Sequence, residues 1–493
     1  MFIIFACLFT KPLCRQLLRI IKNDPMSPDK IKFGTDGWRA IIALDFTVYN
    51  VARVSKALAD WLLQQNDKPK VVVGHDYRFG GGLFTETVAK VLCANGVKVL
   101  LDKGTVSTPM ISMGVLHLKA QQGVVITASH NPPTYNGYKL KGAHGGPSNP
   151  KDIAAVEALI PTDVTMPEQP LSYWESQGLL EYVKLEEMYV SYLQEKFDFN
   201  ALNKSPFKMA YDAMFGAGQN VIRRLLPNAA LIHCDDNPGF HGQAPEPLDK
   251  NLQELAHTVR TTPEIKIGLA TDGDADRIGL YDEDGNFVDA HNIILLLIHY
   301  LHKYKKMNGK VAIAFSVTDR VKKMCESYGL PVEVTPVGFK YISEIMTKED
   351  VLVGGEESGG IAVKGHIPER DGIYDGLLLY EFMTQTGKTL KELCEEVYAV
   401  VGRFVYERND LHIENDKKNA IIQKAAASGY SKFGKYTFNK IENTDGIKYL
   451  LDNGGWIMLR ASGTEPLLRV YAEGNSKTET DDILKDVMET ILN

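Results

Sequence analysis

Ser129 and His130 stand where an apolar segment stops and the chain bends. The β-branched run at 123–126 predicts a short buried strand, and the prolines at 132–133 cannot continue it, because proline lacks the backbone donor that a sheet needs. The side chain of a serine at such a strand end projects beyond the sheet and is not packed in its core. Taken alone, the Ser-His pair is more typical of a turn serine whose hydroxyl caps the local backbone. The other polar loops of the chain decide between capping and chemistry.

Three carboxylates alternate along a tight loop between two apolar strands, at Asp272, Asp274 and Asp276. Such spacing lets oxygen ligands converge on a hard divalent cation, and Mg²⁺ is expected because a phosphate would complete its octahedron. A calcium loop between two helices is one alternative, with Glu283 at its last ligand position. Arg277 opposes it, since that loop needs glycine there, and the flanks are strand-like. A merely solvated acidic loop would leave three close carboxylates to repel one another.

A glycine-rich segment at 354–360 follows another apolar strand and contains Glu356 and Ser358. Glycine lets the backbone approach a ligand, and the two polar side chains could hydrogen-bond sugar hydroxyls. A glycine-rich turn with solvated acids explains this segment equally well when it is considered alone.

The segment 460–466 lies between two predicted strands and combines an arginine with hydroxyl residues and glycine. An arginine fork, two hydroxyls and free backbone amides suit a phosphate group. The residues of this candidate cradle are Arg460, Ser462, Gly463, Thr464 and, on the following strand, Arg469. The alternative is a polar hairpin.

Composition places the chain among ordinary multi-domain proteins. Its 493 residues, 44% of them hydrophobic, can bury substantial cores, and a net charge of −7 with interspersed signs shows no nucleic-acid footprint.

Residues 1–25 contain an apolar run about half as long as a membrane span and lack the order of a signal peptide, so we interpret them as a disordered extension or an upstream start. Six scattered cysteines predict reduced thiols in a cytoplasm, without disulfide or zinc.

Strands alternate with helices up to about residue 400, which predicts mostly parallel sheets. Prolines at 161, 167 and 170 mark a linker, and the pattern changes again near 287 and after Gly402. These features divide the chain into an N-terminal extension, three α/β units and a smaller C-terminal α+β unit: 1–25, 26–174, 175–286, 287–399 and 400–493. Each of the four folded units contains one of the polar loops.

Taken together, these loops resemble those of the α-D-phosphohexomutase family, which includes phosphoglucomutase, phosphomannomutase and phosphoglucosamine mutase. Residues 127–133 with 136–139 are similar to its phosphoserine signature, and the other three loops follow in the family's order and spacing. The resemblance runs from about Ile31 to the C-terminus. It implies an α/β fold of four domains around a central cleft: three related mixed-sheet α/β domains and a C-terminal α+β domain that holds substrate phosphate.

The resemblance also implies an isomerase that interconverts hexose 1-phosphate and hexose 6-phosphate. Ser129 would carry a phosphoryl group, donate it, and recover one from a hexose 1,6-bisphosphate that turns round in the site. Mg²⁺ bound by Asp272, Asp274, Asp276 and the Ser129 phosphate would offset charge on the transferred group. The other implied roles are fixed positive charge from Arg39 and Arg277, proton transfer by Lys139 and His130, sugar binding by Lys340, Glu356 and Ser358, and remote phosphate binding by Arg460, Ser462, Gly463, Thr464 and Arg469.

Substrate choice is predicted from the glycine-rich segment at 354–360, which we call the sugar loop. Its residues Glu357 and Gly360 are closer to those of glucose-type enzymes than to those of mannose- or glucosamine-type enzymes. We expect glucose phosphates, with mannose as a second substrate and phosphoglucosamine mutase activity as the alternative. A sugar-phosphate sensor should have lost Ser129 or an aspartate, and a phosphatase would release inorganic phosphate. The expected partners are small sugar phosphates, and we expect no binding to nucleic acid or membrane. The protein is expected to be a monomer or a homodimer. We also expect its C-terminal domain to close about a hinge near residue 400.

Overall fold

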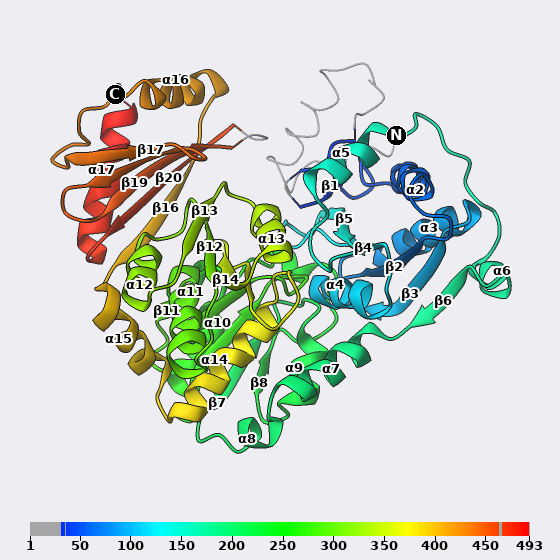
Figure 1. Ribbon diagram of the computed structural model, residues 1–493, viewed down its shortest axis with the longest axis horizontal. Coiled ribbons are helices and arrows are strands. Elements are labelled where there is room, and N and C mark those ends of the chain that lie inside the picture. The colour runs from blue at the N-terminus through cyan, green and yellow to red at the C-terminus, as the bar shows by residue number, and fades with distance from the viewer. Residues whose placement is uncertain (1–30, 35, 463–465, 493) are drawn as a thin grey trace, which may run out of the picture.

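The computed structural model describes residues 31–34, 36–462 and 466–492, and they form four β-sheets in chain order. The first sheet (blue to cyan) and the fourth (orange to red) lie at opposite sides of the molecule, and the second and third lie between and below them (Figure 1). The expected α/β fold, three mixed-sheet domains followed by a smaller C-terminal domain, is confirmed. The predicted extension at 1–25 lies outside the described residues.

The first sheet has the strand order β1-β5-β4-β2-β3-β6, parallel in its last four members and antiparallel at β5 and β1. Its edge strand β6 follows the boundary predicted at residue 174 and pairs with β3. The elements are β1 (Trp38–Ile41), α2 (Val48–Leu63), β2 (Lys70–His75), α3 (Gly81–Ala94), β3 (Lys98–Thr105), α4 (Thr108–His117), β4 (Gln122–Ile126), β5 (Tyr135–Gly142), α5 (Pro150–Ala158), α6 (Leu171–Ser176) and β6 (Leu180–Val183).

Both faces of this sheet are buried, which explains the continuous apolar runs of its strands. Val71 and Val73 of β2 pack in the core that contains α2 and α3, whereas Val72 packs in the core that contains α4. Successive side chains of a strand point to opposite faces, so one run of three valines serves both layers. The layers fix β4, and therefore the position at which Ser129 emerges.

The second sheet, β11-β10-β9-β7-β8, places an antiparallel strand beside a parallel core. The loop of alternating carboxylates connects β9 to that antiparallel neighbour, β10. The elements are α7 (Leu185–Lys196), α8 (Phe199–Asn203), β7 (Lys208–Asp212), α9 (Gln219–Leu225), β8 (Ala230–Ile232), η1 (Phe240–Gly242), η2 (Asp249–Asn251), α10 (Gln253–Thr261), β9 (Ile265–Thr271), β10 (Ile278–Tyr281) and β11 (Phe287–Val288).

The third sheet, β13-β12-β14-β15, is parallel except for β15. Its helix α14 packs against β9 and β10, so the second and third domains share a continuous core. The elements are α11 (Ala290–His299), η3 (Tyr300–Tyr304), β12 (Lys310–Ala314), α12 (Arg320–Tyr328), β13 (Val332–Thr335), α13 (Phe339–Lys348), β14 (Val351–Gly355), β15 (Ile361–Val363), α14 (Gly372–Thr386) and α15 (Leu390–Val401).

The fourth sheet, β16-β20-β19-β18-β17, is antiparallel throughout and has a core of its own. Ile457 and Leu459 of β19 face α16 and α17, while Trp456 and Met458 face Phe315 of the third domain. The elements are β16 (Val405–His412), α16 (Asn415–Ala426), β17 (Phe438–Glu442), β18 (Ile447–Leu451), β19 (Trp456–Ala461), β20 (Leu467–Gly474) and α17 (Lys477–Leu492). Among the described helices, none has the length and apolar character needed to cross a membrane.

Candidate active site

Ser129 lies three residues beyond the end of β4, in a left-handed backbone conformation with φ 52°. Its backbone N–H donates to Thr127 Oγ1 at 2.9 Å, and its hydroxyl donates to Asp272 Oδ2 at 2.7 Å. His130 Nδ1 lies 3.3 Å from the same hydroxyl oxygen. The strand end therefore places Ser129 against the carboxylate loop of the second domain, and its side chain is almost completely buried.

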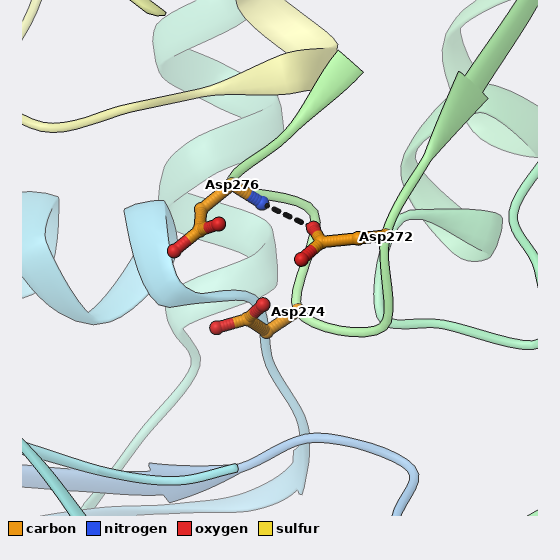
Figure 2. Close-up of side chains that lie close together, drawn as sticks. All are labelled: Asp272, Asp274 and Asp276. Atoms are coloured by element: carbon orange, nitrogen blue, oxygen red, sulfur yellow. Dashed lines mark hydrogen bonds between the residues drawn. The ribbon is translucent and has the colours of Figure 1, made fainter. Parts of the chain in front are cut away.

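The three alternate aspartates converge, as Figure 2 shows. Asp272, Asp274 and Asp276 are buried, and one carboxylate oxygen from each lies within 4.8 Å of the others. Asp272 Oδ1 accepts from the backbone N–H groups of Asp276 at 3.0 Å and Arg277 at 3.1 Å, which closes the loop on itself. Such a loop keeps its remaining carboxylate oxygens turned to a common point.

The free oxygens of this loop suit a hard cation. Asp274 Oδ1 and Asp276 Oδ1 are buried without a hydrogen-bond partner, although an unpaired buried carboxylate oxygen is costly. Carboxylate oxygens are the ligands that Mg²⁺ prefers, and no nitrogen or sulfur ligand is among them. The residues present therefore fit a magnesium site.

Lys139 and Arg370 bind the other carboxylate oxygens, the Oδ2 atoms, of Asp274 and Asp276. Lys139 Nζ contacts Asp274 Oδ2 at 2.8 Å, Asp276 Oδ2 at 2.9 Å and Asp36 Oδ2 at 2.8 Å. Arg370 Nη2 donates to both Asp276 Oδ2 and Asp36 Oδ2 at 2.6 Å. Because these groups come from the first three domains, the metal loop is tied into one network that crosses the domain boundaries.

The electrostatics of the network favour an additional cation. Burial, together with Asp274 and Asp276, raises the pKa of Asp272 well above its usual range. Burial opposes the charged form of Lys139, yet Asp274, Asp276 and Asp36 raise its pKa above the ordinary lysine value. The ammonium of Lys139 is thus retained, and further positive charge near Asp272 would favour the ionised form of that carboxylate.

His130 has the opposite electrostatic environment. Burial, followed by the charges of Arg277 and Arg39, holds the pKa of His130 well below its usual value, so the imidazole is neutral near pH 7. Arg39 Nη1 donates to Asn131 Oδ1 at 2.7 Å, and Arg277 Nη1 lies 3.6 Å from Glu246 Oε1. Arg39 thus contacts the loop that carries Ser129, and both arginines line the same cleft as His130.

A cleft of about 510 Å³ extends away from the serine loop, with walls from all four domains. Ser129, Lys139 and the three aspartates lie beneath its surface, whereas His130, Arg39 and Arg277 face it. The predicted site residues that line the cleft are Arg39, His130, Arg277, Lys340, Glu356, Ser358, Arg460 and Arg469. The cleft is thus the space in which a ligand would meet these side chains.

The glycine-rich loop supplies the middle of the cleft. Glu356 Oε1 accepts from the backbone N–H of Gly338 at 2.9 Å, and burial raises the pKa of Glu356 to about 7. Glu357 accepts a hydrogen bond from Ser316, while Ser358 borders the cleft. Glu356 can therefore serve as a donor or an acceptor close to neutral pH.

Three arginines line the cleft where the fourth sheet borders it. Arg460 and Arg469 stand directly opposite each other on β19 and β20, and Arg408 comes from β16. Arg460 Nε and Arg469 Nε are buried without a hydrogen-bond partner. Like charges directly opposite one another destabilise a sheet, so an anion between them would relieve the repulsion. Asp410 Oδ1 already lies 3.0 Å from Arg408 Nε.

The predicted phosphate loop is only partly described. Gly463 and Thr464 lie outside the described residues, and the backbone oxygen of Ser462 accepts from Lys418 Nζ at 3.1 Å. Reasoning from sequence missed Asp36, Arg370 and Arg408. Asp36 had a weak signal, since it lies in the same glycine-punctuated loop as Arg39, whereas nothing local in the sequence marks Arg370 or Arg408.

The comparisons with known proteins agree across the chain. Family models described as phosphoglucomutase/phosphomannomutase match it four times: α/β/α domain I at 30–165, domain II at 187–285, domain III at 289–401 and the C-terminal domain at 411–490. The matches follow the order of the four sheets, and together they cover more than half of the chain.

Individual relatives span nearly the whole chain. A phosphoglucomutase/phosphomannomutase of Thermococcus kodakarensis is 28% identical over 92% of this chain and 96% of its own length. A phosphoglucosamine mutase of Clostridium botulinum is 28% identical over 93% of this chain and 98% of its own. The solved structure of a presumed phosphomannomutase from Thermus thermophilus is 35% identical, with a TM-score of 0.84, over 95% of this chain and 100% of that chain.

Proposed function

Because the chain belongs to the phosphoglucomutase/phosphomannomutase family and is a phosphohexomutase, we propose that it interconverts the 1- and 6-phosphates of glucose, and secondarily of mannose, through a phosphoserine at Ser129. One observation carries the assignment of the serine: its hydroxyl donates to Asp272 within the cluster of three buried carboxylates, beneath one end of the cleft. A serine that merely capped its turn would have no reason to lie there.

Asp272, Asp274 and Asp276 would hold Mg²⁺ together with the phosphate on Ser129, and their donor set supports this choice. When bound, the ion would offset the negative charge that develops on the transferred phosphoryl group. Lys139 and Arg370 keep two of the carboxylates oriented through their other oxygens. Arg39 and Arg277 add fixed positive charge on the cleft side, where the incoming sugar hydroxyl would approach.

In this proposal, His130 transfers the protons. As the sugar oxygen bonds to phosphorus, the sugar hydroxyl loses its proton, and the Ser129 oxygen needs one as its own bond to phosphorus breaks. A neutral imidazole 3.3 Å from that oxygen, on the wall of the cleft, can accept the first proton and supply the second. Lys139 is buried and held as an ammonium by three carboxylates, which supports an electrostatic role for it.

The arginines of the fourth sheet would bind the phosphate that is not being transferred. Arg460, Arg469 and Arg408 can present planar donor forks to phosphate oxygens, and Ser462 with Gly463 and Thr464 would complete the cradle. Between the two ends, Glu356, Ser358 and Lys340 would bind the sugar. A hexose 1,6-bisphosphate that turns round in the cleft then exchanges which phosphate faces Ser129, and the reaction runs in both directions.

Closure of the fourth domain would keep water from the phosphoserine, since an open site would act as a slow phosphatase. The connection supports such a motion: α15 ends at Val401, Gly402 follows with φ 84°, and β16 starts the fourth sheet. The fourth domain also has its own core, whereas the second and third share one. Its contact with the third domain through Phe315 is small by comparison.

Glucose is favoured by the residues of the sugar loop, where Glu357 lies between Glu356 and Ser358 and Gly360 follows the next glycine. Phosphoglucosamine mutase activity is the second candidate, because several relatives of similar identity are named for that activity. An ammonium at C2 of the sugar is the difference between the two substrates. The carboxylate of Glu357 borders the cleft and could meet it.

The test is to give the enzyme each hexose 1-phosphate of glucose, mannose and glucosamine, with Mg²⁺ and a trace of the matching bisphosphate. We expect glucose 6-phosphate from the wild type and none from Ser129→Ala. Undiminished turnover by Ser129→Ala would refute the phosphoserine. Turnover of glucosamine phosphate alone would overturn the choice of sugar, and release of inorganic phosphate in place of 6-phosphate would indicate a phosphatase.

A further inference from the structure

One buried arginine outside the roles described above holds the backbone of the serine loop. Arg78 Nη2 donates to the carbonyl oxygens of Ser129 at 2.5 Å and Asn131 at 2.7 Å. Its Nη1 donates to the carbonyl oxygens of Pro132 at 2.9 Å and Tyr135 at 3.0 Å. The side chain is completely buried. A single rigid guanidinium thus fixes four backbone carbonyls within seven residues of chain.

Asp76 completes a closed circuit of contacts around Ser129. Arg78 Nε lies 3.4 Å from Asp76 Oδ2, and the same oxygen accepts from Thr127 Oγ1 at 2.5 Å. Thr127 Oγ1 in turn accepts from the backbone N–H of Ser129 at 2.9 Å. Both the N–H and the carbonyl of Ser129 are therefore held, directly or through one hydroxyl, by the pair Asp76 and Arg78.

The conformation of Ser129 explains why such a circuit is needed. With φ 52°, Ser129 occupies the left-handed region, which a residue with a Cβ atom adopts only when its surroundings impose it. The position is also crowded, because a Cβ on Gly273 of the metal loop would come within 2.7 Å of the Ser129 carbonyl oxygen. A small rotation of this peptide would move the hydroxyl away from Asp272.

The second domain covers the outer side of the same guanidinium. The Arg78 guanidinium carbon lies 4.9 Å from the ring centroid of Phe240, a buried residue of η1. This stacking leaves Arg78 between the serine loop and the domain that carries the aspartates. The arginine is therefore placed where it can fix the serine relative to the metal loop.

We propose that Arg78 and Asp76 are positioning residues that hold the Ser129 peptide in its left-handed conformation and so aim the serine oxygen at the metal loop and the cleft. The proposal rests on the proposed role of Ser129 as phosphoryl carrier. Arg78 does not line the cleft and acts through the backbone of Ser129. Its loss should lower kcat much more than it raises KM, because a misplacement of about 1 Å in a reacting group can cost about 10²-fold in rate.

Arg53 provides a matched control. It is a buried arginine of the same domain that donates from Nε to the carbonyl oxygen of Pro161 at 2.7 Å and from Nη1 to Asn50, away from the serine loop. The variants Arg78→Lys and Arg53→Lys therefore both exchange a buried fork for a single ammonium. Only Arg78→Lys should disturb Ser129.

Two further variants keep the test informative if Arg78→Lys folds poorly. Thr127→Val preserves side-chain shape but removes the hydroxyl between Asp76 and the Ser129 N–H, whereas Thr127→Ser retains that hydroxyl. All four variants are compared by hydrogen exchange of the peptide covering 127–135, by thermal unfolding, and by kcat and KM for glucose 1-phosphate.

We expect Arg78→Lys and Thr127→Val to speed exchange in 127–135 at least about tenfold and to lower kcat about 100-fold, with KM within about threefold. Thr127→Ser should recover most of the turnover, and Arg53→Lys should keep kcat within about twofold even if it unfolds at a lower temperature. Wild-type exchange and kcat in folded Arg78→Lys and Thr127→Val would overturn the proposal. A wild type without phosphoserine would instead refute the proposed function, and the exchange data would still decide the role of Arg78.

Discussion

At one end of the cleft, Ser129 and the aspartate loop are almost fully buried and tied to one another by hydrogen bonds from the first three domains. At the other end, Arg408, Arg460 and Arg469 keep side-chain exposures of 28%, 18% and 29% and belong to a domain with its own core. The difference matches the two tasks proposed for these ends. Phosphoryl transfer needs fixed groups, whereas a cradle that repeatedly releases and rebinds phosphate needs accessible ones.

The comparison predicts that damage to the buried end lowers kcat, whereas damage to the exposed end raises KM. The strongest test of it is Ser129→Ala. We expect mutase activity to fall by about 10⁴-fold or more, because the proposed phosphoryl carrier itself is lost. Steady-state kinetics with glucose 1-phosphate and trace bisphosphate measure the change.

Ser428→Ala is the matched control for the serine variant, because Ser428 is also left-handed, with φ 56°, but exposed on the fourth domain. Its activity should equal that of the wild type. A Ser129→Ala protein that retained a tenth of wild-type activity would place the chemistry at another residue.

The second effect concerns the metal loop. Asp274→Asn should weaken binding of Mn²⁺, used as a probe for Mg²⁺, by about 10³-fold, more than the 10- to 100-fold loss typical of residues that only support a ligand. The Asp274 oxygen without a partner is the physical reason. Electron paramagnetic resonance of free Mn²⁺ measures the affinity independently of turnover.

Asp284→Asn serves as its control, because Asp284 lies in the exposed turn after β10 and pairs with Lys391. If Asp274→Asn and the wild type bound Mn²⁺ with equal affinity, the metal would not bind at this loop.

Glu356, between the two ends, gives a prediction on pH. Burial raises its pKa from 4.5 to about 7, so its protonated form is favoured by folding. This contribution, about 3 kcal/mol, is fully present below pH 4.5 and is lost as the pH rises through about 7. Glu356→Gln should therefore flatten the decline in thermal stability between pH 5 and pH 8, as followed by calorimetry.

Glu395→Gln, at an exposed residue paired with Arg403, should leave that decline unchanged. A Glu356→Gln protein whose unfolding temperature varied with pH as steeply as the wild type would show that another group causes the decline.

The smallest expected effect is at the partly exposed arginines of the fourth domain. Arg460→Met should raise KM for glucose 1-phosphate about tenfold and change kcat by less than about threefold, since a charged hydrogen bond contributes roughly 1.5–3 kcal/mol and two other arginines remain. Arg403→Met, which removes a surface arginine, should leave KM unchanged. A fall in kcat with constant KM would erase the distinction between the two ends.

The positions of Ser129 and the aspartates could be predicted from the sequence because each polar loop directly follows an apolar strand. That local pattern does not reveal which distant groups meet the loop. Arg370 and Asp36 share a hydrogen bond across 334 residues of chain, and only the packing of the third domain on the first brings them together. Lys139 is a related case: the family resemblance implies proton transfer for it, but nothing local in the sequence predicts the three carboxylates that surround its ammonium.

The strand pattern predicted the α/β domains, but not the pairing of strands across a linker. β6 comes after the proline-marked segment and pairs with β3 of the first sheet, a non-local contact without a signal in residues 180–183. Similarly, Arg408 and Asp410 lie two residues apart on the same face of β16, a pattern that many partly exposed strands show. Its place in the cleft follows from the strand order of the fourth sheet, which sequence periodicity does not encode.

The most direct test of the account follows a labelled phosphate. The wild-type enzyme is incubated with Mg²⁺ and hexose 1,6-bisphosphate carrying ³²P, its phosphorylated residue is mapped by mass spectrometry, and the labelled protein is then chased with unlabelled glucose 1-phosphate. The account predicts label on Ser129 that passes to the sugar within the time of a turnover. Label on another residue, or label on Ser129 that survives the chase, would contradict it.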